Sequence, residues 1–203
     1  MALITISRGS CSGGKEIAEK VAERLGYTCV AREILLEASA EFNVPEVKLV
    51  RAIHDAPTIL TRLGSTKERY VQYIRTAFIK YMLRDNVVYH GLAGHFFLQG
   101  ISHALKVRIV SDLMDRVQLE MERQKISREE PLALLRKDDE ERRKWSRFLY
   151  GIDTEESHLY DLVINTKGLS TDTIVSLICH TVQRDQFRTT PESRKMLEER
   201  LKT

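Results

Sequence analysis

Residues 9–15 read Gly-Ser-Cys-Ser-Gly-Gly-Lys and fit the pattern G-x-x-x-x-G-K. Just before them, residues 3–6 read Leu-Ile-Thr-Ile, which is typical of a buried strand. After the lysine, apolar residues recur at helical spacing, at Ile17, Ala18, Val21, Ala22 and Leu25. A strand, a glycine-rich turn and a helix in this order form the context in which the pattern indicates a phosphate-binding loop.

The residue types in this loop suit phosphate for physical reasons. Glycines let the backbone curl, so that successive N–H groups point at phosphate oxygens. The N-terminus of the next helix adds partial positive charge, and Lys15 adds an ammonium group. We therefore expect ATP or a similar nucleotide to be bound by Gly9, Ser10, Cys11, Ser12, Gly13, Gly14, Lys15 and Glu16. The alternative is a turn that only joins strand to helix, but the glycines together with the lysine favour phosphate binding.

Two residues of the loop have more than one interpretation. Glu16 stands where a serine or threonine usually helps to hold Mg²⁺. It would hold the metal indirectly, or it would only stabilise the helix N-terminus by its charge. Cys11 would have a lowered pKa beside Lys15 and the helix N-terminus. The simpler interpretation of Cys11 is a small residue that fits a tight loop.

Composition narrows the class of protein. The 203 residues are 42% hydrophobic and 30% charged, with a net charge of +3, which suits one globular domain. Acidic and basic residues are mixed along the chain, so we expect no nucleic-acid partner. No stretch is long and apolar enough for a membrane span, and the first residues do not resemble a signal peptide. Three cysteines without CxxC spacing favour a reducing compartment, so we expect a cytoplasmic protein.

Four more short apolar segments are interpreted as strands, at residues 27–30, 86–91, 105–110 and 162–165. Strands that mostly alternate with helices predict a three-layer α/β fold, in which helices cover both faces of a five-stranded parallel sheet. Residues 32–85 have no strand pattern and are expected to form a helical insertion. Its aromatic residues at helical spacing are interpreted as core rather than as a surface that stacks on a base: Tyr70, Tyr73, Phe78 and Tyr81.

Four segments carry a resemblance to a known family. They are Ile4 to Ala18, which includes the loop, Ala31-Arg32-Glu33-Ile34-Leu35, the charged run 137–144, and Tyr160 to Thr166. In this order they resemble the cytidylate-kinase-like proteins of bacteria, which belong to the nucleoside monophosphate kinase group of P-loop proteins. The resemblance covers about residues 3–182.

This resemblance implies a P-loop NTPase fold and a division of the single domain 1–203. The core would be formed by residues 1–31, 86–126 and 151–184, with a monophosphate-binding insertion at 32–85, a lid at 127–150 and a C-terminal helix within 185–203. It also implies that the γ-phosphate of ATP is transferred, with Mg²⁺, to a nucleoside monophosphate such as cytidylate or to a related small acceptor. The expected partners are therefore small nucleotides.

The same resemblance implies roles for single residues. The catalytic residues would be Lys15, Arg136, Arg142 and Arg143. The acceptor would be bound by Arg32, His90, Asp139 and Arg147, with Arg32 reaching its phosphate. From the residues alone, the charged run at 136–144 is better explained as a solvated helix face.

The chain also departs from the family pattern. After the third strand the family usually has Gly-Arg, and here the pair is Gly91-Leu92. This puts cytidylate itself in doubt as the acceptor, and His90 and His95 are candidates to replace the arginine as donors. Two other functions stay open: a nucleotide-binding or sensing module that has lost efficient transfer, and a kinase for a different small acceptor. The tail at 185–203 is expected to dock on the core or on a second copy in a homo-oligomer.

Overall fold

The computed structural model describes residues 1–54, 66–91, 94–125, 127, 129–150 and 152–202. Leu92, which departs from the family pattern, lies outside the described residues. No described helix is long and apolar enough to cross a membrane.

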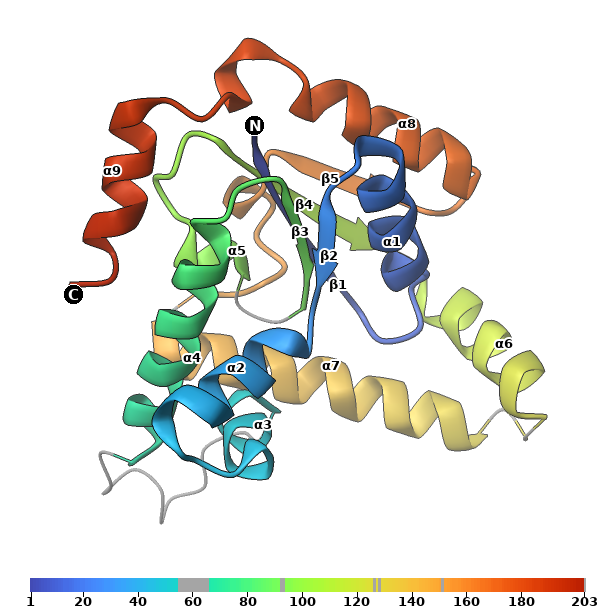
Figure 1. Cartoon of the computed structure of the whole chain (residues 1–203). Coiled ribbons are helices and arrows are strands. Elements are labelled where there is room, and N and C mark those ends of the chain that lie inside the picture. Colours follow the sequence, from blue (N-terminus) through green and yellow to red (C-terminus); the bar gives the residue numbers. More distant parts are fainter. Residues whose placement is uncertain (55–65, 92–93, 126, 128, 151, 203) are drawn as a thin grey trace.

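A five-stranded parallel sheet forms the centre of the molecule (Figure 1). Its strands are β1 (Leu3–Arg8), β2 (Thr28–Val30), β3 (Val87–His90), β4 (Ala104–Val110) and β5 (Leu162–Asn165). The strand order is β2-β3-β1-β4-β5, so the strand that leads into the glycine-rich loop lies in the middle. Its side chains Leu3, Ile4 and Ile6 are fully buried. The predicted sheet is confirmed.

Helices cover both faces of this sheet, which confirms the three-layer fold. On one side lie α1 (Gly14–Leu25) and α8 (Thr171–Val182), and on the other lie α4 (Thr66–Met82) and α5 (Gly94–Phe97) (Figure 1). Each face has its own apolar cluster, because parallel strands are apolar on both sides. The apolar stripe of α1 predicted from the sequence is buried at Ile17, Ala18, Val21 and Ala22.

In the described residues between β2 and β3 the chain forms α2 (Glu33–Phe42), α3 (Glu46–His54) and α4, within the segment that was expected to be a helical insertion. Phe78 is fully buried and contacts the rings of Tyr89 and Phe97, as its interpretation as core predicts. Tyr73 instead stacks on Phe42, with ring centroids 4.1 Å apart. Tyr70 and Tyr81 are partly buried at the edge of the same core.

Helix α7 (Glu129–Tyr150) runs below the carboxyl ends of the strands in Figure 1. Helix α6 (Leu113–Gln124) lies beside one end of α7. This edge of a parallel α/β sheet is where ligands usually bind. The segment that we expected to be a lid is therefore helical and lies over the glycine-rich loop.

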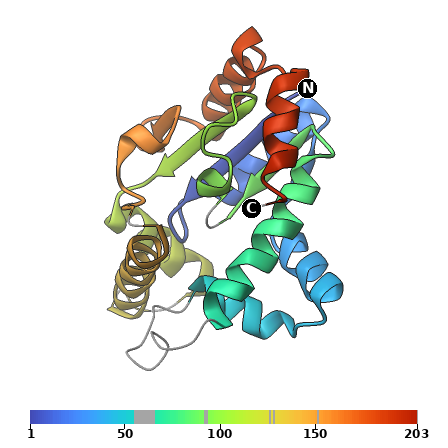
Figure 2. The same cartoon turned by 90° about the vertical axis from the view of Figure 1, so that its left-hand side faces the viewer.

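The tail docks on the core of its own chain. After the short 3-10 helices η2 (Ser157–Leu159) and η3 (Asp185–Phe187), the last helix is α9 (Pro191–Glu199). Figures 1 and 2 show it on the same side of the sheet as α4 and α5. Leu197 is only 1% exposed within the core cluster of that side, and Thr189 donates a 2.7 Å hydrogen bond to Asp85. Of the two predicted alternatives, docking on the core or on a second copy, the structure shows docking on the core.

Candidate functional site

The glycine-rich loop connects β1 to α1 and leaves the start of α1 without a side-chain cap. Gly13, the residue before the helix, has a φ of 74°, which glycine adopts without strain. It forms no side-chain cap, so the first N–H groups of α1 can bind an anion. Gly14 is also needed, because a Cβ there would lie 2.7 Å from Cδ of Arg8. The two glycines shape the turn where we expect phosphate.

Lys15 and Glu16 are exposed on the first turn of α1. The Lys15 side chain is 67% exposed, and its ammonium lies 3.7 Å from Glu19. An exposed pair of this kind is weak, so the long lysine side chain can turn toward a ligand. The carboxylate of Glu16 lies 2.7 Å from Nζ of Lys20, one turn further along the helix.

Helix α7 contacts the loop through Arg142. Its Nη1 donates a 2.7 Å hydrogen bond to the carbonyl oxygen of Arg8, and its Nη2 donates a 3.1 Å bond to Oγ of Ser10. Ser10 in turn donates to Asp138 at 3.0 Å. Residues of the predicted lid thus contact the phosphate loop directly.

Helix α6 adds a residue that the sequence reasoning missed. Arg116 is 7% exposed, and its guanidinium donates two hydrogen bonds to Asp139, at 3.1 and 2.6 Å. It also donates to the carbonyl oxygen of Ser10 at 3.3 Å. Asp139, which was predicted to bind the acceptor, is therefore held by Arg116 beside the loop. Nothing in the sequence separates this arginine from the chain's other basic residues.

Cys11 is held by a carboxylate. Its thiol donates a 3.0 Å hydrogen bond to Oε2 of Glu120, a buried residue of α6. Burial and this carboxylate raise the pKa of Cys11 to about 11. The suggestion that Lys15 and the helix N-terminus lower this pKa is therefore wrong. Glu120 also accepts a 2.7 Å hydrogen bond from Arg123, and this cation stabilises the negative charge of the Glu120 carboxylate.

The remaining lid arginines lie further along α7. Arg143 pairs with Glu155 at 2.5 Å, and Arg147 pairs with Asp153 at 2.5 Å. Arg136 is exposed. Arg142, by contrast, donates hydrogen bonds to Ser10 of the loop and to Arg8 just before it.

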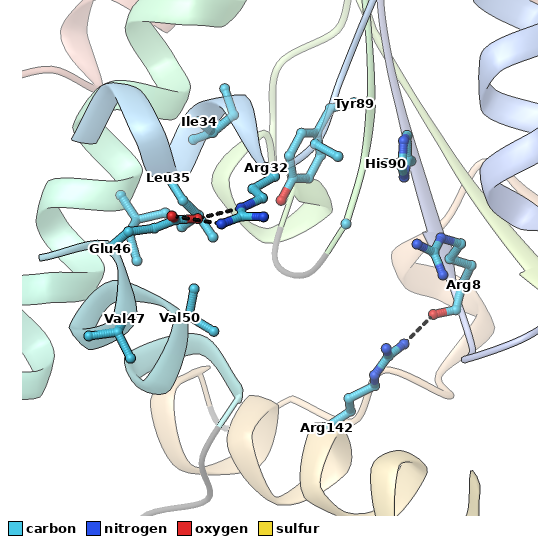
Figure 3. Close-up of a pocket in the computed structure, with 13 residues that line it drawn as sticks. Arg8, Arg32, Ile34, Leu35, Glu46, Val47, Val50, Tyr89, His90 and Arg142 are labelled. Carbon is cyan, nitrogen blue, oxygen red and sulfur yellow. Dashed lines mark hydrogen bonds and ion pairs between the residues drawn. The ribbon is translucent and has the colours of Figure 1, made fainter. Parts of the chain in front are cut away.

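A pocket of about 530 Å³ opens next to the loop, between the sheet, the insertion and α7 (Figure 3). Arg8 and Arg142 lie on one side of this pocket, and Arg32 and Glu46 lie on the other. Apolar side chains of α2, α3 and α4 form much of the remaining wall: Ile34, Leu35, Val47, Val50 and Ile74. Arg8 belongs to the segment that carries the family resemblance, but it was not predicted as a site residue.

Arg8 and Arg142 form a partly buried cationic pair. Burial lowers the pKa of Arg8, and the charge of Arg142 lowers it further. Burial also lowers the pKa of Arg142, although Asp138 and Asp139 act in the opposite direction. The Nε of Arg8 is buried and has no hydrogen-bond partner among the described residues. An anion at this position would offset the desolvation of both cations.

The two histidines near the end of β3 differ in their surroundings. His90 lines the pocket, and burial followed by the charge of Arg8 lowers its pKa, so it is neutral at pH 7. His95 is buried, lies 3.2 Å from the hydroxyl of Tyr160, and has a pKa that burial lowers to about 3. The described residues contain no group of three or more side chains that could hold a metal ion.

A central strand, an uncapped glycine-rich turn, a helix and a cationic pocket at the carboxyl ends of parallel strands define the class of small P-loop kinases. The sequence model of the Cytidylate kinase-like family matches residues 3–168 of this chain. The chain belongs to this family.

Curated relatives agree with the family. The chain is 26% identical over 185 residues to a cytidylate kinase of Archaeoglobus fulgidus, which covers 89% of this chain and 94% of that protein. It is 30% identical over 93 residues to a cytidylate kinase of Thermococcus kodakarensis, where the match spans 46% of this chain and 47% of the other. This second match spans about half of each protein.

Solved structures share the fold. An uncharacterized protein from Eubacterium ventriosum has a TM-score of 0.70 at 20% identity, over 89% of this chain and 97% of that chain. A shikimate kinase from Bacteroides thetaiotaomicron has a TM-score of 0.53 at 10% identity, over 90% and 99%. At such identities the likeness concerns the fold alone.

Proposed function

We propose that this small P-loop kinase transfers the γ-phosphate of ATP to a nucleoside monophosphate or a related small acceptor that carries a phosphate. The observation that carries the proposal is the adjacency of two sites. Gly14, which follows the uncapped turn at Gly13, packs against the side chain of Arg8, and Arg8 lines the pocket together with Arg142. A kinase needs its donor and acceptor phosphates side by side.

The loop provides the donor side. Its backbone N–H groups and the helix N-terminus bind the phosphates of ATP, and Lys15 turns from Glu19 to the terminal phosphates. Ser10 donates a hydrogen bond to Asp138 of α7, and Cys11 donates one to Glu120 of α6. These contacts fix the conformation of the loop before the nucleotide binds.

The pocket provides the acceptor side. Arg8 and Arg142 bind the acceptor phosphate, because they are partly buried cations with donors still available. His90 is neutral and donates or accepts one further hydrogen bond there. In this proposal residues 32–85 are the acceptor-binding insertion and residues 127–150 are the lid.

Arg142 is the lid residue that we assign to the transferring group. It reaches both Arg8 and Ser10, and therefore lies between the donor loop and the acceptor pocket. Guanidinium groups in this place stabilise charge that develops on the phosphoryl oxygens. Arg136, Arg143 and Arg147 lie on the same helix and have supporting roles.

Mg²⁺ neutralises phosphate oxygens in reactions of this class. Glu16 is paired with Lys20. The described residues contain no group of three or more side chains that could hold a metal ion. We therefore propose that Mg²⁺ is held mainly by the nucleotide. All three cysteines are free, which suits a reducing compartment such as the cytoplasm.

A nucleotide sensor is the second candidate function. It is favoured by Glu16, a paired carboxylate at the position of the usual hydroxyl. A sensor would bind ATP through the same loop but transfer its phosphate very slowly.

The test is a transfer assay with ATP and Mg²⁺ against a panel of nucleoside monophosphates, nucleosides and phosphorylated sugars. Lys15→Ala is measured beside Lys20→Ala, which changes an exposed lysine of the same helix. We expect transfer to at least one monophosphate, with a loss of about 10²–10³-fold in Lys15→Ala and little change in the control. Tight ATP binding without transfer to any acceptor would favour the sensor instead.

A further inference from the structure

A second, smaller cavity lies beside the acceptor pocket, at the carboxyl end of β1. Its volume is about 50 Å³, and it shares Arg8, Gly91 and Arg142 with the acceptor pocket. It also reaches Gly9, the first residue of the glycine-rich loop. Figure 3 shows Arg8 and Arg142, the two arginines that line both spaces. In the proposed function, this cavity lies between the phosphates of the donor and the phosphate of the acceptor.

Arginine side chains form much of the wall of this cavity. Four arginines from β1, β4 and α7 line it: Arg8, Arg108, Arg142 and Arg143. The carboxylates of Asp139 and Glu155 line it too, so the formal charge of these side chains together stays positive. The buried Nε atoms of Arg8 and Arg143 have no hydrogen-bond partner among the described residues. Clustered guanidinium groups with unused donors favour a tetrahedral oxyanion such as a phosphoryl group.

The two carboxylates of the cavity are held in different ways. Asp139 accepts two hydrogen bonds from the buried guanidinium of Arg116, at 3.1 and 2.6 Å. Glu155 instead pairs with Arg143, whose Nη2 lies 2.5 Å from its Oε1. The side chain of Glu155 is 56% exposed and that of Arg143 is 38% exposed. Because exposed ion pairs are weak, the carboxylate of Glu155 is the one that an entering anion can displace.

The backbone around Glu155 is fixed, so its side chain can move alone. The carbonyl oxygen of Thr154 accepts hydrogen bonds from Arg108 of β4 and, at 3.0 Å, from the hydroxyl of Tyr160. The N–H of Glu155 donates a 3.0 Å hydrogen bond to Asp153. A change of the Glu155 rotamer is therefore enough to take its carboxylate away from the cavity.

We propose that the carboxylate of Glu155 is an internal competitor for this cavity, which pairs with Arg143 in the unliganded protein and leaves when a phosphoryl group enters. The inference rests on the proposed function, because it takes the phosphoryl group between ATP and the acceptor as the ligand. A carboxylate and a phosphoryl group bind guanidinium groups through the same kind of charged oxygen. Displacement of Glu155 frees Arg143 to stabilise charge on the phosphoryl oxygens.

The strength of the ion pair sets the size of the expected effect. Anion affinity is reduced by the fraction of molecules in which Arg143 is free to bind the anion. Exposed pairs of single charges favour the paired form by up to about fivefold. Removal of the competing carboxylate should therefore tighten anion binding by about three- to sixfold. A pair that only stabilises the fold predicts no such gain.

The experiment measures the dissociation constant for inorganic phosphate by calorimetry, at constant ionic strength and with ADP in excess to occupy the loop. Glu155→Gln removes the charge and keeps the shape of the side chain. Glu156→Gln is the matched control, because Glu156 pairs with His158 at 3.3 Å and is not among the residues that line the cavity. We expect Glu155→Gln to bind phosphate about three- to sixfold more tightly than wild type, and Glu156→Gln to stay within about twofold of it.

Arg143→Ala separates competition from general charge repulsion. In this background the cavity lacks the group for which the carboxylate competes, so the further change Glu155→Gln should alter the affinity by less than about twofold. The inference would be overturned by no gain in Glu155→Gln, by an equal gain in Glu156→Gln, or by the full gain in the Arg143→Ala background. Absence of phosphate binding in Glu155→Gln would overturn it as well.

Phosphate binding does not require transfer, so the two proposals fail separately. A sensor would show the tighter binding in Glu155→Gln without phosphoryl transfer by any of the proteins. A kinase in which the pair of Arg143 and Glu155 is only structural would show transfer without the tighter binding.

Discussion

Single residues of α7 differ in how directly they reach the proposed site. Arg142 donates to Arg8 and to Ser10, whereas Arg147 lies about one helical turn further on and pairs with Asp153. The sequence shows both as members of one charged run, because the side of the helix that faces the loop depends on how α7 docks. The structure therefore separates residues that the sequence treats alike.

This difference gives the first prediction. Arg142→Ala should lower kcat/KM by about 10²–10³-fold, since it removes the guanidinium between loop and pocket. Arg147→Ala should lower it by less than about tenfold, because it removes an exposed ion pair. Steady-state kinetics of both variants provide the comparison. Equal losses in the two variants would contradict the placement of Arg142.

Cys11 gives a second prediction at this scale. Burial and the Glu120 carboxylate raise its pKa to about 11, so very little thiolate is present at pH 7.5. Alkylation by iodoacetamide, followed on the Cys11 peptide by mass spectrometry, should speed up about tenfold per pH unit between pH 7 and 9. Glu120→Gln should make it faster at each pH. A rate that levels off below pH 8 would show that the thiol is more acidic than this contact allows.

Local sequence patterns predict the strands and helices, but they do not predict which residues of different helices come into contact. Apolar runs predicted the five strands of the sheet, and helical periodicity predicted helices such as α1. Glycines predicted the loop between β1 and α1. The pairs that shape the site join different helices: Arg116 and Asp139 are 23 residues apart, and Arg32 and Glu46 are 14 apart. Their contact depends on how α6 packs on α7 and α2 on α3, which sequence periodicity does not specify. Arg8 was missed because it ends a strand that is otherwise buried.

The packing of α6 on α7 is tested by a double-mutant cycle. Arg116→Ala and Asp139→Ala should each destabilise the protein, and the double variant should cost less than their sum by about 1–3 kcal/mol. The reason is that the buried guanidinium of Arg116 loses a bidentate partner in Asp139→Ala. Urea unfolding gives the free energies. Lys137 and Glu141, an exposed pair on α7 at 4.0 Å, provide the control cycle, with an expected coupling below about 0.5 kcal/mol. A coupling for Arg116 no larger than this would mean that the pair does not hold α7 in place.

For the whole molecule, buried neutral histidines link stability to pH. Burial lowers the pKa of His90, His95 and His103, and that of His95 to about 3. Because the unfolded chain binds these protons more readily, the contribution of each histidine is complete above about pH 6.5 and is lost as the pH falls toward its folded pKa. Acid should therefore destabilise the folded protein.

His95 allows this to be measured. Between pH 7.5 and 5.5 it should account for a loss of about 1.4 kcal/mol in the free energy of unfolding. His95→Gln removes the titration, so its stability should fall less over this range than that of wild type. Urea unfolding at the two pH values supplies the difference. Parallel loss in both proteins would mean that His95 is not held in its neutral form.

The central claim concerns the molecule as a whole: the glycine-rich loop and the pocket beside it are two halves of one phosphoryl-transfer site. The most direct measurement is the affinity for a ligand that spans both, adenosine and cytidine joined through five phosphates. Because the second half binds within the same molecule, this ligand should bind at least about 10²-fold more tightly than either ATP or CMP, and Lys15→Ala and Arg142→Ala should each weaken it. Affinity no greater than that of ATP would contradict the account, since the loop and the pocket would then not form one site.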